Sequence, residues 1–196
     1  QRGLADLDGQ VERQDPAGFS HRAAPVHARL RASLARIGSI LADGDGSDKS
    51  TDGLSSVLFL CSMNAIRSPM AEEIAKRVLP KSVYVQSAGA RKGKPDPFLE
   101  IILEEAGLAG AEHEPRSLDE LEDDFFDLVI TLSPEAHHRA LELTRSGRVH
   151  VEYWPTIDPS TATGSREQIL GVYREVFEGL RSRIFARFAP DNPISS

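Results

Sequence analysis

The first 52 residues of the 196-residue chain divide into three stretches by their pattern of apolar and polar positions. Residues 1–22 are polar with little periodicity, whereas apolar residues recur every three or four positions over about 24–43, which predicts one amphipathic helix. The stretch DGDGSDKSTDG that follows has the composition of a linker. We therefore expect an N-terminal extension over 1–52, a folded domain over 53–190 and a short tail over 191–196.

Within the folded domain, short apolar runs alternate with segments of helical periodicity. The expected strands are the runs 57–60, 83–85, 126–132 and 149–153. The first run, VLFL, is apolar throughout, as in a central parallel strand buried on both faces. Polar caps and early prolines mark the expected helix starts at Ser68-Pro69, Asp96-Pro97, Ser133-Pro134 and the Ser165/Gln168 capping box.

This alternation predicts an α/β domain in which helices cover both faces of a parallel sheet. Ligands of such sheets bind at the carboxyl ends of the strands. The loop that begins at Cys61 and the loop that follows Tyr153 are therefore the places to search for a functional site.

Composition narrows the class of protein. The chain carries 23 Lys and Arg against 30 Asp and Glu, a net charge of −7, which disfavours a nucleic-acid partner because phosphate binding needs a basic surface. No apolar stretch approaches the ~20 residues of a membrane helix, so no membrane partner is expected. One cysteine excludes a disulfide framework and a cysteine zinc cluster, and the scattered histidines suggest no metal site. We expect a cytoplasmic protein, where a lone thiol stays reduced.

The segment VLFLCSMNAIRSP combines a strand end, a thiol and a helix start. A turn of this shape, from Cys61 to Arg67, directs successive backbone N–H groups inward and forms a cradle for one tetrahedral oxyanion. Arg67 adds a planar two-pronged donor. The guanidinium and the helix N-terminus favour the thiolate of Cys61, and the Ser68 hydroxyl is placed to donate to that sulfur. The expected substrate-binding residues of the cradle are Ser62, Met63, Asn64, Ala65 and Ile66.

A nucleophile of this kind needs a proton donor for the leaving group. The best candidate is Asp158, in the loop after the fourth expected strand, because loops at the carboxyl ends of neighbouring parallel strands face the same crevice.

The chain resembles the low molecular weight protein tyrosine phosphatase family over roughly 55–189, in the segment LFLCSMNAIRSPMAE, the Ser87-Ala88-Gly89 strand end and the late Asp158-Pro159 pair. The resemblance implies a small doubly wound sheet of four parallel strands in the order 2-1-3-4. It implies that Cys61 is the nucleophile, Arg67 the phosphate-binding residue, Ser68 the thiolate stabiliser and Asp158 the general acid, with Asn64 organising the loop. Related thioredoxin-coupled arsenate reductases share the C-x-x-N-x-x-R-S motif.

The chain departs from the family pattern at several positions. Met63 stands where the family usually has glycine, and Ile66 where many members have a second cysteine. Ser133 replaces an acidic residue after the third strand. The aromatic residues that often follow the acid are missing, so Tyr153 and Trp154 are the remaining candidates for a ring-binding wall, with core packing as their other interpretation.

We therefore expect a cysteine-dependent phosphomonoesterase that acts through a phosphocysteine intermediate and needs no cofactor, because the cradle supplies the positive field. Its expected ligands are a phosphotyrosine protein or a small aryl phosphate, and inorganic phosphate or a similar oxyanion. Two alternatives stay open: a single-cysteine arsenate reductase that uses an external thiol, and a catalytically weak module that binds oxyanions or phosphorylated ligands. A monomer or weak homodimer is expected, with the extension docking or self-associating.

Overall fold

The computed structural model describes residues 53–108, 112–122, 125–143 and 149–189. The predicted extension over 1–52, with its amphipathic helix, and the predicted tail over 191–196 lie outside these residues.

Four parallel strands form one sheet in the order β2-β1-β3-β4. The strands are β1 (Ser56–Cys61), β2 (Tyr84–Gly89), β3 (Leu128–Thr131) and β4 (His150–Tyr153). The structure thus confirms the predicted parallel sheet and its strand order. Because all four strands run the same way, the loops after β1, β2, β3 and β4 all leave from one edge of the sheet.

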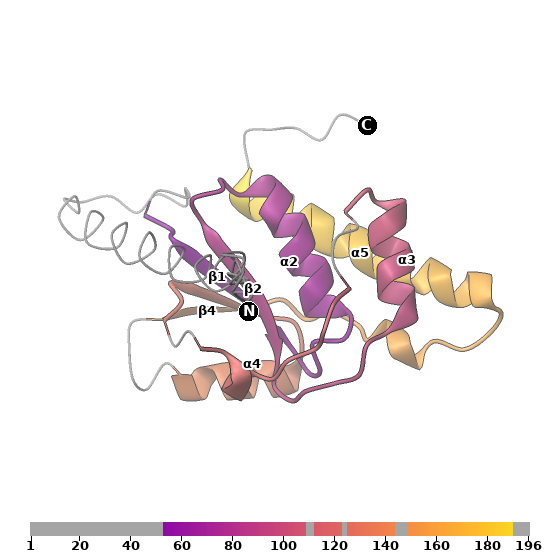
Figure 1. The fold of residues 1–196 in the computed structure, drawn as a ribbon, viewed down its shortest axis with the longest axis horizontal. Coiled ribbons are helices and arrows are strands. Elements are labelled where there is room, and N and C mark those ends of the chain that lie inside the picture. The colour runs from indigo at the N-terminus through magenta and orange to yellow at the C-terminus, as the bar shows by residue number, and fades with distance from the viewer. Residues whose placement is uncertain (1–52, 109–111, 123–124, 144–148, 190–196) are drawn as a thin grey trace, which may run out of the picture.

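Helices cover both faces of this sheet (Figure 1). The helices are α2 (Arg67–Val78), α3 (Pro97–Glu105), α4 (Pro134–Leu143) and α5 (Arg166–Phe188), with short 3-10 turns η2 (Leu118–Glu120) and η4 (Pro159–Thr161). Helices α2, α3 and α5 lie on one face, and α4 lies on the other (Figure 1). Within the described part of the chain, no helix combines the length and the apolar character needed to cross a membrane.

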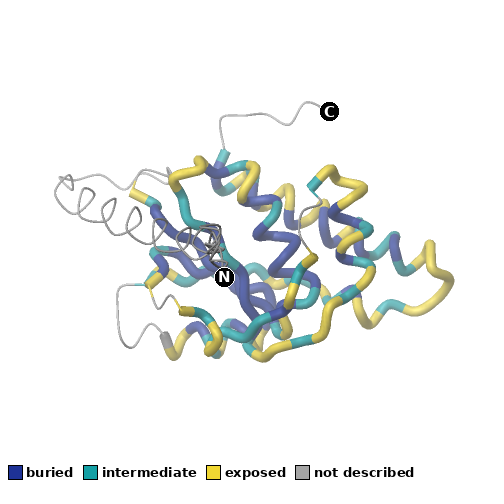
Figure 2. Tube along the Cα trace, in the orientation of Figure 1, coloured by how far each residue is buried: buried dark blue, intermediate teal, exposed yellow. Residues whose placement is uncertain are grey.

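Strand β1 is buried on both sides, as its apolar sequence predicts. Val57, Phe59 and Cys61 belong to the core beneath α2, α3 and α5, whereas Leu58 and Leu60 belong to the core beneath α4. Figure 2 shows the central strands and the inner side of α2 in the colour of buried residues. This alternation along β1 places the Cys61 side chain on the α2 face, at the carboxyl end of the central strand.

Three of the four expected helix starts are confirmed by side-chain caps. The Asp96 carboxylate accepts from Phe98 N, Ser133 Oγ accepts from Ala136 N, and Ser165 forms a capping box with Gln168. The prediction that Ser68 caps α2 is wrong: the helix begins at Arg67, and Ile66 is its N-cap residue without a side-chain hydrogen bond. Ser68 lies inside the first turn, where its hydroxyl contacts Cys61 Sγ and donates to the carbonyl oxygen of Ala88.

Candidate active site

The loop from β1 to α2 wraps around the sulfur of Cys61, a side chain that is 2% exposed. Asn64 has a backbone φ of 54°, in the left-handed region that Asn tolerates better than most residues. This local bend brings the backbone N–H of Asn64 within 3.2 Å of Cys61 Sγ, as a donor. The sulfur is therefore enclosed by its own loop and faces at least one inward-directed amide.

The side chain of Asn64 connects this loop to β2 and to the segment that precedes η2. Its Nδ2 group donates to Ser68 Oγ at 3.0 Å and to Ser87 Oγ at 2.9 Å, and its Oδ1 atom accepts from the backbone N–H of Arg116 at 3.0 Å. Asn64 is fully buried, so losing these partners would leave a buried amide unsatisfied. The network holds the loop in the conformation that surrounds Cys61.

Ser68 Oγ donates to the carbonyl oxygen of Ala88 at 3.1 Å and lies 3.0 Å from Cys61 Sγ, where either atom can be the donor. A serine hydroxyl has one proton to donate, and Asn64 Nδ2 already donates to the oxygen. When the sulfur is a thiolate, it is the charged acceptor, and a hydrogen bond to a charged acceptor is the stronger one. The hydroxyl proton is therefore positioned to stabilise a thiolate at Cys61.

The Arg67 side chain reaches from the first turn of α2 to the loop after β4. Its Nη1 group donates to the carbonyl oxygen of Thr156 at 3.0 Å, and its Nη2 group lies 2.7 Å from Asp158 Oδ2 and 3.3 Å from Ser62 Oγ. Arg67 is buried, whereas the Asp158 side chain is 38% exposed. The rule that parallel-strand loops converge therefore placed Asp158 correctly beside the Cys61 loop.

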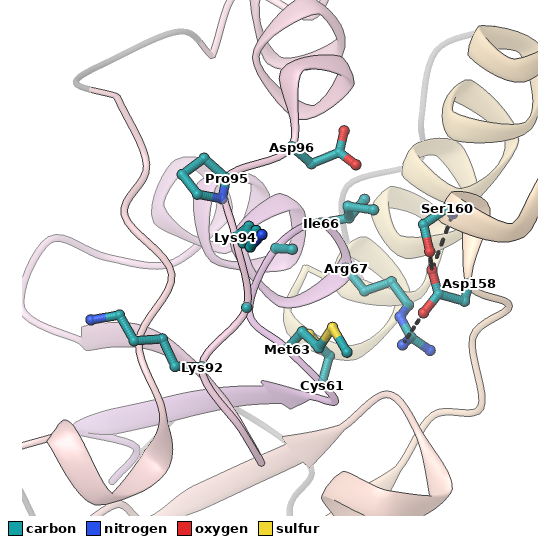
Figure 3. Close-up of a pocket in the computed structure, with 12 residues that line it drawn as sticks. Cys61, Met63, Ile66, Arg67, Lys92, Lys94, Pro95, Asp96, Asp158 and Ser160 are labelled. Carbon is teal, nitrogen blue, oxygen red and sulfur yellow. Dashed lines mark hydrogen bonds and ion pairs between the residues drawn. The ribbon is translucent and has the colours of Figure 1, made fainter.

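Asp158 is itself held by the turn that it starts. Its Oδ1 atom accepts from the backbone N–H of Ser160 at 3.1 Å and from Ser160 Oγ at 2.7 Å, which caps η4 (Figure 3). One carboxylate oxygen thus faces Arg67 and the other is fixed by η4.

These groups share a cleft of about 680 Å³. Its lining residues come from the Cys61 loop, the segment between β2 and α3, and the loop after β4 (Figure 3). They are Cys61, Met63, Ala65, Ile66, Arg67, Lys92, Gly93, Lys94, Pro95, Asp96, Asp158 and Ser160.

Two residues expected to bind substrate do not line the cleft. Asn64 is buried behind the sulfur, and Ser62 Oγ donates to Ser133 Oγ at 3.0 Å, toward the start of α4. Ser68 also lies behind Cys61 and is fully buried. The side chains of these three residues support the loop, whereas Met63, Ala65 and Ile66 face the cleft.

Tyr153 and Trp154 do not form a ring-binding wall, since neither lines the cleft. The Tyr153 ring stacks on His137 of α4, with ring centroids 4.7 Å apart. Trp154 packs against the core beneath α5, and its Nε1–H donates to Glu152. The core interpretation is therefore correct for Trp154, and Tyr153 belongs to the α4 side of the sheet.

Several supporting residues were not predicted from the sequence. His113 Nε2 lies 2.7 Å from the carbonyl oxygen of Asn64, and Ser87 donates to the buried carboxylate of Glu72. Ser87 lies near the carboxyl end of β2, so the strand-end rule was a signal that pointed to it. His113 has no comparable signal, because it reaches Asn64 from a segment without regular structure.

Asp96 lines the cleft and also contacts Tyr173 of α5. Its Oδ2 atom accepts from the hydroxyl of Tyr173 at 3.0 Å. Burial raises the pKa of Tyr173, and the negative charges of Asp96 and Asp158 raise it further. Tyr173 therefore remains a neutral donor and holds the Asp96 carboxylate at the start of α3.

The described residues contain no group of three or more His, Cys, Asp or Glu side chains placed to hold a metal ion. The positive groups of the cleft are the guanidinium of Arg67 and the ammonium groups of Lys92 and Lys94. The arrangement brings together at one cleft a thiol that accepts from the Asn64 N–H and contacts the Ser68 hydroxyl, one guanidinium and one carboxylate.

Comparison with known proteins finds relatives of this chain both in sequence and in fold. The profile of the low molecular weight phosphotyrosine protein phosphatase family matches residues 56–183. An arsenate reductase of Bacillus licheniformis is 33% identical over 136 residues, which cover 68% of this chain and 94% of that protein.

Solved structures agree on the fold. An arsenate reductase of Archaeoglobus fulgidus is 28% identical, with a TM-score of 0.51, over 65% of this chain and 94% of that one. A tyrosine phosphatase of Erwinia amylovora is 24% identical, with a TM-score of 0.54, over 69% of this chain and 94% of that one. At this identity the likeness supports the fold alone.

Proposed function

This chain belongs to the low molecular weight phosphotyrosine protein phosphatase family, and we propose that it hydrolyses phosphomonoesters through a phosphocysteine intermediate. The observation that carries the proposal is that Cys61 and the Arg67–Asp158 pair line one cleft, with Ser68 Oγ 3.0 Å from the sulfur. A nucleophile, an oxyanion-binding group and a proton donor are the three parts that this reaction needs.

In the first step, the Cys61 thiolate attacks phosphorus and forms the S–P bond. Arg67 and the backbone amides of the loop stabilise the charge on the phosphoryl oxygens. The P–O bond to the leaving group breaks, and protonated Asp158 gives its proton to the departing oxygen. The alcohol leaves, and Asp158 becomes a carboxylate.

In the second step, water attacks the phosphocysteine. The Asp158 carboxylate takes a proton from that water, and the S–P bond breaks with its electron pair returning to sulfur. Ser68 donates to the thiolate as it leaves. Phosphate is released, and Cys61 and Asp158 regain the forms in which they began.

Arsenate reduction is the second candidate, favoured by the relatives of this chain that are named arsenate reductases. Arsenate is a tetrahedral oxyanion of the kind that this loop binds. Cys61 is the single cysteine of the sequence, so a relay through further protein thiols is not available. Two molecules of an external thiol, such as glutathione or mycothiol, would supply the two electrons and leave as a disulfide.

The experiment measures both activities on the same purified protein. We expect hydrolysis of p-nitrophenyl phosphate and no arsenate-dependent oxidation of an external thiol. Cys61→Ser should abolish turnover while phosphate still binds. Thiol oxidation without ester hydrolysis would replace our proposal with the reductase, and oxyanion binding without either activity would identify a binding module.

The setting of this activity is part of the proposal. We place the enzyme in the cytoplasm, where reducing conditions keep the Cys61 thiol free for catalysis. Phosphotyrosine proteins and small aryl phosphates are both proposed substrates, and a monomer or weak homodimer stays a prediction.

A further inference from the structure

We propose that Lys94 selects phosphomonoesters whose leaving group carries a second negative charge. This inference rests on the proposed hydrolase activity and concerns the wall of the cleft that lies across from Asp158. It adds a substrate class to the reaction and assigns a specificity role to a residue outside the Cys61 loop.

The wall that carries Lys94 is held against the Cys61 loop by main-chain hydrogen bonds. Backbone N–H groups of Ala90, Arg91 and Gly93 donate to the carbonyl oxygens of Cys61, Ser62 and Met63 at 2.8, 2.9 and 2.9 Å. The wall therefore follows the loop along its length, and its position relative to the sulfur is set by the backbone.

Gly93 brings the two segments closer than any other residue would allow. A Cβ atom at Gly93 would lie 2.6 Å from the carbonyl oxygen of Met63 and 2.8 Å from Met63 Cβ. Contacts this short are repulsive, so the close approach depends on glycine. Lys94 is the next residue, so its backbone lies immediately beside this close contact with the loop.

Lys94 differs from the other two cations that line the cleft, because Arg67 and Lys92 form ion pairs within the described residues and Lys94 does not. Arg67 donates to Asp158 and to Thr156. Lys92 pairs with Glu120 at 3.0 Å, and Figure 3 shows its ammonium group directed away from Cys61. Among the described residues, Lys94 has no ion-pair or hydrogen-bond partner, and it is exposed where it lines the cleft.

The neighbouring carboxylate of Asp96 forms no ion pair with Lys94. Asp96 lines the same wall, but its two oxygens accept from the backbone N–H of Phe98 at 2.9 Å and from the Tyr173 hydroxyl at 3.0 Å. Asp96 keeps its negative charge but is held at the start of α3, and no ion pair links it to the Lys94 ammonium, which remains available to an anion that enters the cleft.

Charge is also the strongest selective feature that the wall offers. None of the twelve lining residues is aromatic, so a substrate ring finds no stacking partner there. The chain as a whole is acidic, with a net charge of −7, so the unpaired Lys94 ammonium is a local attraction for anions rather than part of a general one. A carboxylate or a second phosphate on the leaving group matches this focus.

The test uses two substrate pairs that differ in the charge of the leaving group. One pair is a phosphotyrosine pentapeptide flanked by glutamates or by glutamines, and the other is 3-carboxyphenyl phosphate or phenyl phosphate. For the wild-type protein we expect a higher kcat/KM for the anionic member of at least one pair. Lys94→Gln should reduce that preference about fivefold, the upper range for one partly exposed ion pair, and Lys94→Arg should retain it.

Two controls separate a local contact from a general field effect. Lys81→Gln removes an exposed lysine that precedes β2, at the opposite end of the sheet, and should leave the preference unchanged. Salt at 1 M, where the screening length falls to about 3 Å, should remove the preference of the wild type. The pair that responds to Lys94→Gln identifies whether peptides or small molecules supply the second charge.

The outcomes distinguish this inference from the function on which it rests. If p-nitrophenyl phosphate is hydrolysed but Lys94→Gln leaves both pairs unchanged, the inference is overturned and the hydrolase proposal stands. If Lys81→Gln changes the preference as much as Lys94→Gln does, the effect is general and the inference is again overturned. If no phosphomonoester is hydrolysed, both fail together.

Discussion

The guanidinium of Arg67 and the carboxylate of Asp158 form an ion pair in the cleft, with Nη2 2.7 Å from Oδ2. Each partner is needed elsewhere in the proposed reaction, Arg67 for the phosphoryl oxygens and Asp158 for the leaving group. A guanidinium carries donors only, so a phosphoryl oxygen and the Asp158 carboxylate compete for the same edge of Arg67. Asp158, which supplies the proton in the proposed reaction, should therefore also weaken the binding of inorganic phosphate.

Asp158→Ala should lower the inhibition constant of phosphate about threefold, because it removes both the competitor and a negative charge from the cleft. The measurement is competitive inhibition of p-nitrophenyl phosphate hydrolysis by phosphate. Asp119→Ala is the control, since it removes an exposed carboxylate paired with Arg139 outside the cleft. Weaker phosphate binding in Asp158→Ala would instead show that Asp158 chiefly orients Arg67.

The same variant should discriminate between leaving groups. A p-nitrophenolate ion departs without a proton, whereas an alkoxide does not, so loss of the general acid matters most for alkyl phosphates. We expect Asp158→Ala to lower the single-turnover rate of enzyme phosphorylation about tenfold for p-nitrophenyl phosphate and about a hundredfold or more for an alkyl phosphate. Equal losses for the two substrates would remove Asp158 from the role of proton donor.

The fold was predictable because its signals are local. The apolar run of β1, the alternation with helices and the caps at Asp96, Ser133 and Ser165 are each visible within a few residues. The strand order came from the family resemblance, which the sheet confirms. The misplaced start of α2 has a physical cause, since the hydroxyl of Ser68 serves the sulfur of Cys61 and not the helix end.

The site was predictable to the extent that its parts are close in sequence or follow the strand-end rule. Spacing within one loop was enough to single out Cys61 and Arg67, and the rule brought in Asp158. His113 and Arg116 contact Asn64 from 49 and 52 positions away, and no sequence spacing expresses such contacts. The wall with Lys94 follows β2 at the same sheet edge, so the rule applied to β2 would have indicated it.

Ser68→Ala should slow the reaction through the sulfur rather than through substrate binding. The substitution removes the hydroxyl 3.0 Å from Cys61 Sγ and leaves the buried Asn64 Nδ2 group with one partner fewer. We expect kcat for p-nitrophenyl phosphate to fall about tenfold with little change in KM, and inactivation by iodoacetamide at neutral pH to slow. The variant should also lose about 1 kcal/mol of stability.

Ser165→Ala is the matched control for Ser68→Ala. It removes the hydroxyl that caps α5, outside the cleft lining, and should also cost about 1 kcal/mol of stability. Its iodoacetamide rate should equal that of the wild type. If the two variants lose stability alike and neither changes the reactivity of Cys61, Ser68 supports the fold and does not stabilise the thiolate.

Gly93 and Gly179 should respond in opposite ways to the same added methyl group. At Gly93 the new Cβ would lie 2.6 Å from Met63 O, whereas at Gly179, inside α5, it would meet nothing within 4 Å. Gly93→Ala must therefore push the wall away from the Cys61 loop, and we expect kcat/KM for p-nitrophenyl phosphate to fall about tenfold, less than the roughly hundredfold that a misplacement of about 1 Å can cost. Gly179→Ala should leave kcat/KM unchanged and raise Tm by about 3 °C, because alanine in a helix interior stabilises by about 0.5–1 kcal/mol over glycine. Wild-type kcat/KM in Gly93→Ala would mean that the wall yields without affecting catalysis, and that the close contact with Met63 does not position the cleft.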